Sequence, residues 1–150
     1  GLQRGPSKPA RTYGVQAEAE LLLSRAYIPI LTQLLHVLAD QMSRDEFDAV
    51  MREVGRGLMK GRAMPQGTIR ERVAAASVLL NDLGGMTEVN EEDGVLVICG
   101  HGCPLAAATA KYPEACNALE SLLSEFVGQS VNKCCDQYAR QRCCFEVPLR

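Results

Sequence analysis

The feature that most constrains the fold of this 150-residue sequence is a change of hydrophobic pattern at Gly84-Gly85. Before these glycines, apolar residues recur every three or four positions, which is typical of amphipathic helices. After them, the segment MTEVNEEDGVLVICG (86–100) has the alternation and the central turn of a two-stranded hairpin. Helices followed by short strands predict an α+β domain, in which N-terminal helices precede a small antiparallel sheet of β-β-α-β-β order.

Three helices are predicted before the glycines. The first starts near residue 17 and carries a wide apolar stripe from Tyr27 to Met42. Pro29 must start this helix or kink it, because proline lacks an N–H and clashes with the preceding turn. The second helix begins at Ser43 and the third at Thr68, each with a glutamate three residues later that completes a capping box. The stripe is broad enough for the core and for a partner helix, so we expect it to form a homodimer contact.

The chain then returns to helix over 103–128 and ends in two short strands, SVNKCC (130–135) and RCCFEV (142–147). Gly128 is a suitable C-terminal stop for the helix. The segment VLVIC (95–99) is apolar on both faces, which predicts a central strand.

The composition is that of an ordinary globular domain: 47% of the residues are hydrophobic, 23% are charged, and the net charge is −2. A net charge this close to zero does not indicate a nucleic-acid-binding protein. Residues 1–16 differ, because they include Arg4, Lys8 and Arg11 but no acid. We interpret 1–16 as a basic, extended linker and 17–150 as one domain. There is no recognisable signal sequence and no apolar run of about 18 residues, so we expect a cytoplasmic protein without a membrane partner.

All seven cysteines lie beyond residue 98. An odd number cannot form a complete set of disulfides, and in the cytosol clustered cysteines bind metals or do redox chemistry more often than they form structural disulfides. The densest cluster is CCDQYARQRCC (134–144). Neighbouring side chains on a strand point to opposite faces, so each adjacent pair is divided between the two faces of the sheet.

A hairpin with a three-residue loop at 138–140 would place Cys135 opposite Cys143 on one face and Cys134 opposite Cys144 on the other. Cys143 shares its face with Phe145 and Val147, so the first pair is expected to point inward. The second pair is expected at the surface or on a polar rim.

Two further thiols can join the inner pair. Cys116 lies on the apolar face of its predicted helix, and Cys103 precedes Pro104 where free backbone N–H groups favour a thiolate. The predicted ligand set is therefore Cys103, Cys116, Cys135 and Cys143, and four thiolates suit an iron–sulfur cluster or a tetrahedral zinc ion.

Other ligands stay open. A second set is Cys99, Cys103, Cys116 and Cys144, and Cys134 is a further alternate. His101 lies in the loop CGHGC (99–103), and His36 lies at the edge of the apolar stripe of the first helix. We interpret neither histidine as a ligand of the site.

Enzymatic activity is not expected. The sequence has no CxxC motif, no phosphate-binding loop and no evident Ser-His-Asp set. Two alternative functions remain. One is a zinc-stabilised module for dimerisation or for binding a small ligand. The other is a thiol-based redox switch, because the adjacent Cys134 and Cys135 could form a disulfide with each other.

Two segments resemble the SufR-type iron–sulfur-responsive repressors, a family of bacterial winged helix–turn–helix regulators in the broad DeoR/ArsR-like group. GPSKPARTYGVQAEAELLLSRAYIPILTQLLHVL (5–38) resembles the junction between their wing and the following long helix. CGHGCPLAAATAKYPEACNALESLLSEFVGQSV (99–131) resembles their effector domain, with Cys-Pro, then Pro-Glu-x-Cys, an acidic helix and a last cysteine near the C-terminus.

The resemblance implies a dimeric sensor that binds an iron–sulfur cluster through Cys103, Cys116 and one of Cys143 or Cys144. The state of the cluster would then change the affinity for DNA. The fourth ligand varies among relatives, which leaves Cys135 and Cys99 open. The sequence departs from the family because its cysteines are doubled and because it contains no helix–turn–helix. We therefore expect 1–16 to be the remnant of a wing, and DNA to be bound only through a winged helix–turn–helix domain outside these 150 residues.

Overall fold

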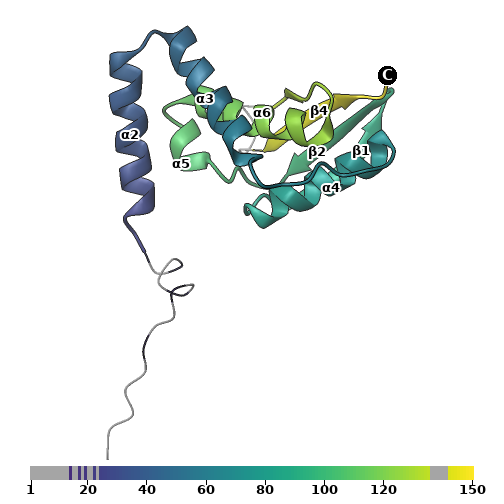
Figure 1. Ribbon diagram of the computed structural model, residues 1–150, viewed down its shortest axis with the longest axis horizontal. Helices are drawn as coiled ribbons and strands as arrows, with labels where there is room; N and C mark the ends of the chain where they lie inside the picture. The colour runs from purple at the N-terminus through teal and green to yellow at the C-terminus, as the bar shows by residue number, and fades with distance from the viewer. Residues whose placement is uncertain (1–13, 15–16, 18, 20–21, 23, 136–141) are drawn as a thin grey trace, which may run out of the picture.

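The computed structural model describes Gly14, Ala17, Ala19, Leu22, residues 24–135 and residues 142–150. The described residues form helices followed by a four-stranded antiparallel sheet (Figure 1), which confirms the predicted α+β class. In chain order the elements are α2 (Tyr27–Gln41), α3 (Arg44–Leu58), α4 (Ile69–Asp82), β1 (Thr87–Glu92), β2 (Val95–Gly100), α5 (Ala106–Thr109), the 3-10 helix η1 (Pro113–Ala115), α6 (Cys116–Val127), β3 (Asn132–Lys133) and β4 (Cys143–Pro148). Apart from Gly14, the predicted linker 1–16 lies outside the described residues.

The helix starts follow the predicted signals. The side chain of Ser43 accepts from the backbone N–H of Glu46, and the Glu46 carboxylate accepts from the N–H of Ser43, so α3 begins in a complete capping box. Thr68 does the same for α4. Pro29 is the third residue of α2, so it lies in the first turn of the helix, where its missing N–H costs no hydrogen bond.

Helix α2 lies to one side of the molecule, where it packs against α5 and touches α3 (Figure 1). Its one buried residue is Leu35, which joins a small core with Phe47, Met51, Ala108 and Ala115. Much of the predicted apolar stripe is exposed in the described chain; these side chains are Tyr27, Ile28, Ile30, Leu31, Leu34 and Val37. The helix therefore uses only part of its apolar surface within the chain.

The strands pair in the order β1-β2-β4-β3. Strand β2 is central, as predicted, but the strand order differs from the β-β-α-β-β order expected, because β4 rather than β3 lies next to β2. The reason is burial. Cys143, Phe145 and Val147 of β4 are fully buried, whereas β3 consists of the exposed Asn132 and Lys133. The apolar strand takes the interior of the sheet, and the short polar strand takes its edge.

The register between β3 and β4 agrees with the one predicted from CCDQYARQRCC. Lys133 lies opposite Phe145, and the N–H of Cys134 donates to the carbonyl oxygen of Cys144 at 2.8 Å. The same register brings Cys135 opposite Cys143. The predicted loop at 138–140 lies outside the described residues.

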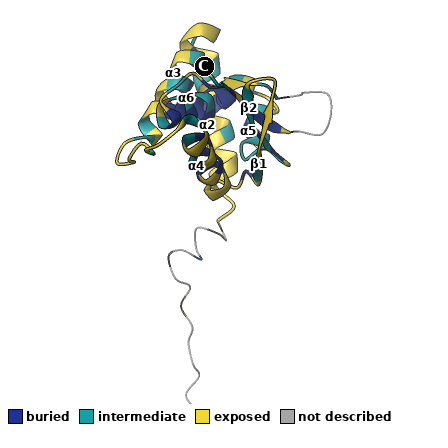
Figure 2. Ribbon diagram, turned by 90° about the vertical axis from the view of Figure 1, so that its right-hand side faces the viewer, coloured by how far each residue is buried: buried dark blue, intermediate teal, exposed yellow. Residues whose placement is uncertain are grey.

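The main core lies between the sheet and the two helices α4 and α6, and Figure 2 shows buried residues gathered between these layers. Helix α3 packs on the other side of α6. The two helices approach closely at Gly55, where an added Cβ would overlap the carbonyl oxygen of Ala118.

The helix predicted over 103–128 is not continuous, which corrects the sequence-based expectation. The chain forms α5, turns, and restarts at η1 with Pro113 as its first residue, because proline cannot continue a helix from the preceding turn. Helix α6 ends where Gly128 adopts a left-handed conformation with φ of 73°. The break places Cys103 and Cys116 on separate segments.

Candidate functional site

Four thiols meet at one end of the main core. Cys116 begins α6 and Cys143 begins β4, and both are buried in the core cluster. Cys103, in the turn after β2, and Cys135, which follows β3, are half-buried and pack against the same cluster. These are the four residues of the first predicted ligand set, and they come from four separate segments.

The thiols contact one another as a chain of pairs. Cys143 lies near both Cys103 and Cys135, and Cys135 also lies near Cys116. The Cys135 thiol donates to the carbonyl oxygen of Cys144 at 3.6 Å. The Cys103 sulfur lies 3.8 Å from the Thr109 hydroxyl oxygen. We call Cys103, Cys116, Cys135 and Cys143 the inner thiols.

The pKa is lowered at two of the inner thiols. The hydrogen bond from Cys143, helped by the Leu105 backbone and by Thr109, lowers the pKa of Cys103 to about 6, although burial opposes the shift. Hydrogen bonds from Cys116 and Cys143, together with the charge of Lys133, lower the pKa of Cys135 to about 2. A backbone partner at Cys103 agrees with the thiolate expected at this turn.

The other two inner thiols act as the donors. Hydrogen bonding to Cys103 and Cys135, and then burial, raise the pKa of Cys143. Hydrogen bonding to Cys135, and then burial, raise the pKa of Cys116. The closeness of the four thiols therefore lowers the pKa of Cys103 and Cys135 and raises that of Cys116 and Cys143.

No group of three or more His, Cys, Asp and Glu side chains among the described residues is arranged to hold a metal ion. The four inner thiols therefore do not form a preformed metal site. Their number and type nevertheless fit a group bound by four thiolates, since two are stabilised as anions and the other two carry protons that a cation can displace. Binding would require the sulfurs to turn toward a common point.

The alternative set of Cys99, Cys103, Cys116 and Cys144 is not brought together. Cys99 and Cys144 lie directly opposite each other on β2 and β4 and are joined by a disulfide. This pair occupies the opposite face of the sheet from Cys143, because adjacent strand residues alternate. Cys144 was expected at the surface, but it is only 8% exposed, because β4 lies inside the sheet and Cys144 is flanked by Cys99 on one side and Cys134 on the other.

The remaining alternates have other surroundings. Burial and the nearby Glu146 carboxylate raise the pKa of Cys134 to about 11, so this thiol is neutral beside its anionic neighbour Cys135. His101 pairs with Glu88 at 2.8 Å, and His36 with the Tyr112 hydroxyl at 2.8 Å. Each histidine therefore has a partner apart from the thiols, as expected for bystanders.

A carboxylate that the sequence analysis missed ties the Cys135 segment to the helices. Glu120, on α6, accepts from the backbone N–H of Lys133 at 2.8 Å and pairs with Arg52 of α3 at 2.9 Å. Its side chain is only 13% exposed, so the two contacts are partly shielded from water. The sequence contains only a weak indication of this contact. Lys133 immediately precedes Cys134-Cys135, and Glu120 follows Cys116 by one helical turn.

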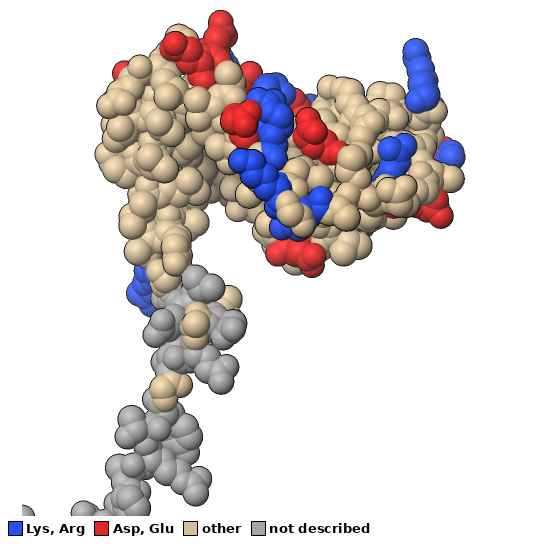
Figure 3. All heavy atoms as spheres, viewed as in Figure 1, with Lys and Arg blue, Asp and Glu red and all other residues tan. Residues whose placement is uncertain are grey.

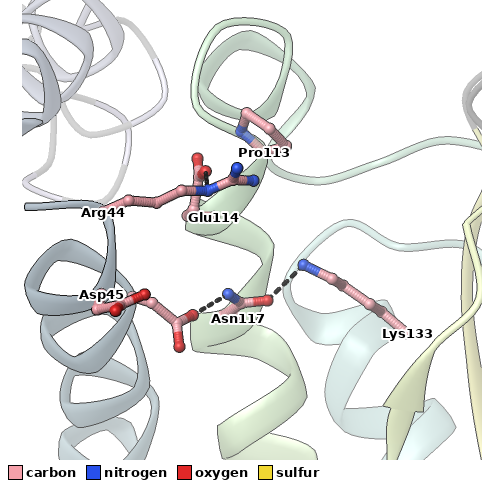
Figure 4. A pocket seen from close by; sticks show the side chains of 7 residues that line it. Arg44, Asp45, Pro113, Glu114, Asn117 and Lys133 are labelled. Atoms are coloured by element: carbon pink, nitrogen blue, oxygen red, sulfur yellow. Dashed lines mark hydrogen bonds and ion pairs between the residues drawn. The ribbon is translucent and has the colours of Figure 1, made fainter.

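A polar pocket of about 450 Å³ lies beside this carboxylate, at the meeting point of α3, η1, α6 and β3. Asn117 donates to the carboxylate of Asp48 and accepts from the Lys133 ammonium group, and Figure 4 shows Asn117 and Lys133 pointing toward each other. Arg44 pairs with Glu114 at 2.9 Å across the pocket. Because these charges and amides satisfy one another, we interpret the pocket as part of the α3–α6 contact.

No protein-family model and no curated protein matches this chain. The resemblance to iron–sulfur-responsive regulators therefore remains a prediction. Among the described helices, none has the length and apolar composition needed to cross a bilayer.

Proposed function

We propose that residues 17–150 are the sensor domain of a bacterial transcriptional regulator and bind an iron–sulfur cluster through Cys103, Cys116, Cys135 and Cys143. The observation that carries this proposal is the meeting of these four thiols, from four separate segments, at one end of the core. Four cysteines are a common ligand set for such clusters.

A purely structural set of buried cysteines accounts less well for the arrangement. Structural cysteines behave as small neutral hydrophobes, and burial opposes their ionisation. Here the contacts favour the anion at Cys103 and Cys135 despite burial. Buried anions are costly unless a positive group compensates them, and a bound metal centre would provide this compensation.

The contacts around Cys135 suggest how binding or loss of the cluster changes the structure of the rest of the domain. A bound cluster would supply a redox-active group whose gain or loss is the signal. Cys135 lies two residues after Lys133, whose backbone N–H is held by Glu120 and, through it, by Arg52 of α3. Cys135 as a ligand fixes this segment, and its release frees the segment to move relative to α6. Helix α3 directly follows α2 in the chain.

Helix α2 is proposed as the homodimer contact. Asp40 is its one charged residue, and Figure 3 shows its surface as almost free of charge. A second copy would cover the exposed apolar side chains named above. DNA would be contacted by a winged helix–turn–helix domain of the same regulator, in the cytoplasm, and we propose no enzymatic reaction for the sensor domain.

Zinc is the second candidate for the same site, because four thiolates also form a tetrahedral zinc site. The test is elemental analysis of protein purified anaerobically, with iron, acid-labile sulfide and zinc measured per chain. An iron–sulfur site predicts iron and sulfide in similar amounts, whereas a zinc site predicts zinc without sulfide. A protein with none of the three would contradict both forms of the proposal.

Single Cys→Ser variants assign the ligands. We expect Cys103→Ser, Cys116→Ser, Cys135→Ser and Cys143→Ser each to lower the bound metal at least tenfold, in line with the loss of a ligand. Cys134→Ser is the matched control, since Cys134 is next to Cys135 but lies on the other face, and it should keep the wild-type metal content. Equal losses from Cys134→Ser and Cys135→Ser would contradict the assignment.

A further inference from the structure

A second set of cysteines lies on the opposite face of the sheet from the inner thiols. Cys144 of β4 is bonded to Cys99 of β2 on one side. On its other side it faces Cys134, whose N–H donates to the Cys144 carbonyl oxygen at 2.8 Å. The Cys134 thiol contacts Glu146, and Glu146 shares a face with Cys144 because the two residues are two positions apart on one strand.

We propose that Cys99, Cys144 and Cys134 form a thiol–disulfide exchange site, in which Cys144 changes its partner between Cys99 and Cys134. We call these three residues the outer cysteines. They stand in one row across β2, β4 and the end of β3, with Cys144 in the middle. In a hydrogen-bonded antiparallel pair the Cα atoms are about 5.5 Å apart, a usual separation for disulfide-bonded residues. The Cα spacing of such a pair is therefore within the range of a disulfide, and the two side chains need only a local shift to bring their Cβ atoms closer, with no change of register.

The exchange balances without any external oxidant or reductant. Cys134 is neutral in the resting site and reacts through the minor fraction that has lost its proton. Its sulfur attacks the sulfur of Cys144, and the Cys134–Cys144 bond forms as the Cys99–Cys144 bond breaks. The electron pair leaves with the Cys99 sulfur, which takes up the proton that Cys134 has lost. Cys99, on β2, and Cys134, directly after β3, flank Cys144 from opposite sides of β4, which suits a displacement at the Cys144 sulfur.

The outer site is distinct from the inner thiols but covalently next to them. Cys134 adjoins Cys135, and Cys144 adjoins Cys143. A Cys134–Cys144 disulfide would fasten the Cys135 segment to β4, whereas the Cys99–Cys144 disulfide ties β4 to β2 instead. The inference concerns this exchange only, goes beyond the proposed function and does not depend on a bound cluster.

The first test uses Cys99→Ser, which removes the half-exposed partner and leaves the other two outer cysteines in place. The variant is oxidised with diamide, alkylated in acid and digested. Trypsin cuts after Lys133, Arg140 and Arg142, so residues 134–140 and 143–150 are released as separate peptides. We expect these peptides to be joined, with fragmentation placing the bond between Cys134 and Cys144. Unlinked peptides, or a bond between Cys135 and Cys143 alone, would overturn the proposal.

The second test uses the wild-type chain, whose folding is not in question. After incubation without reductant and quenching in acid, we expect both the Cys99–Cys144 and the Cys134–Cys144 bonds. Cys134→Ser, treated in the same way, should retain only the Cys99–Cys144 bond. Wild-type protein that contains only Cys99–Cys144 at every time point would show that Cys144 does not change its partner.

Discussion

At the scale of single residues, the inner thiols differ in pKa because they lie close together, so that the pKa is lowered at Cys103 and Cys135 and raised at Cys116 and Cys143. The contrast is sharpest between adjacent residues. Hydrogen bonds from two thiols lower the pKa of Cys135 to about 2, while burial and Glu146 raise that of Cys134 to about 11. The two side chains are neighbours in sequence and lie on opposite faces of the sheet. The face, rather than the position in the chain, therefore decides the chemistry of each cysteine.

This contrast predicts the order of alkylation in the reduced, metal-free protein. At neutral pH the thiolate is the reactive form, so iodoacetamide should modify Cys135 at least about tenfold faster than Cys134, even though a low pKa also reduces nucleophilicity. Peptide mapping of residues 134–140 at successive times measures both rates. Equal rates, or faster modification of Cys134, would contradict the assigned protonation states.

At the scale of the elements, the sequence predicted most of the local structure correctly. Ser43 and Thr68 begin α3 and α4 with capping boxes, and Asp93 and Gly94, both with positive φ, form the turn between β1 and β2. These signals act over a few residues, so they can be recognised without knowledge of the tertiary structure.

Features that depend on contacts between distant parts of the chain were harder to predict from the sequence. The strand order was wrong because it depends on which strand buries more apolar surface, and β3 is too short to compete with β4. The inner pair Cys135 and Cys143 could be chosen from strand alternation and apolar neighbours. The disulfide between Cys99 and Cys144 could not, because it depends on the pairing of β2 with β4, two strands far apart in sequence. Glu120 was missed for the same reason.

The contact between α3 and α6 provides a prediction with an internal control. Gly55→Ala places a methyl group against the carbonyl oxygen of Ala118, so it should lower the free energy of unfolding by about 1–3 kcal/mol. Gly57, on the same helix, has open space around its Cα. Gly57→Ala should therefore raise stability by about 0.5–1 kcal/mol, since alanine favours the helix. Urea denaturation measures both changes, and a loss of stability in both variants would contradict the close approach at Gly55.

At the scale of the whole molecule, the central question is what covers α2. The rest of the described chain forms two cores, and α2 contributes Leu35 to the smaller one while six apolar side chains stay exposed. A cluster of exposed apolar side chains usually marks a site of interaction with another molecule. We propose that a second copy of the chain covers it.

The assignment predicts the effect of a charge on this surface. Leu34 is 52% exposed, and Leu34→Glu should convert the dimer to a monomer, because a carboxylate would be buried without a partner. Gln33→Glu adds the same charge about 100° further round the helix, away from Leu34, and should leave the dimer intact. Sedimentation velocity measures the mass of each. A wild-type protein that is already monomeric, or a dimeric Leu34→Glu variant, would contradict the assignment.

The sensor role depends on a cluster being bound by the inner thiols, and acid-labile sulfide is the measurement that tests this most directly, because zinc and free thiols contribute none. Sulfide should be determined together with iron on the wild-type protein, prepared anaerobically, with Cys135→Ser in parallel. We expect sulfide and iron in similar amounts in the wild type and a loss of both in the variant. Wild-type protein without sulfide would contradict the proposed iron–sulfur sensor.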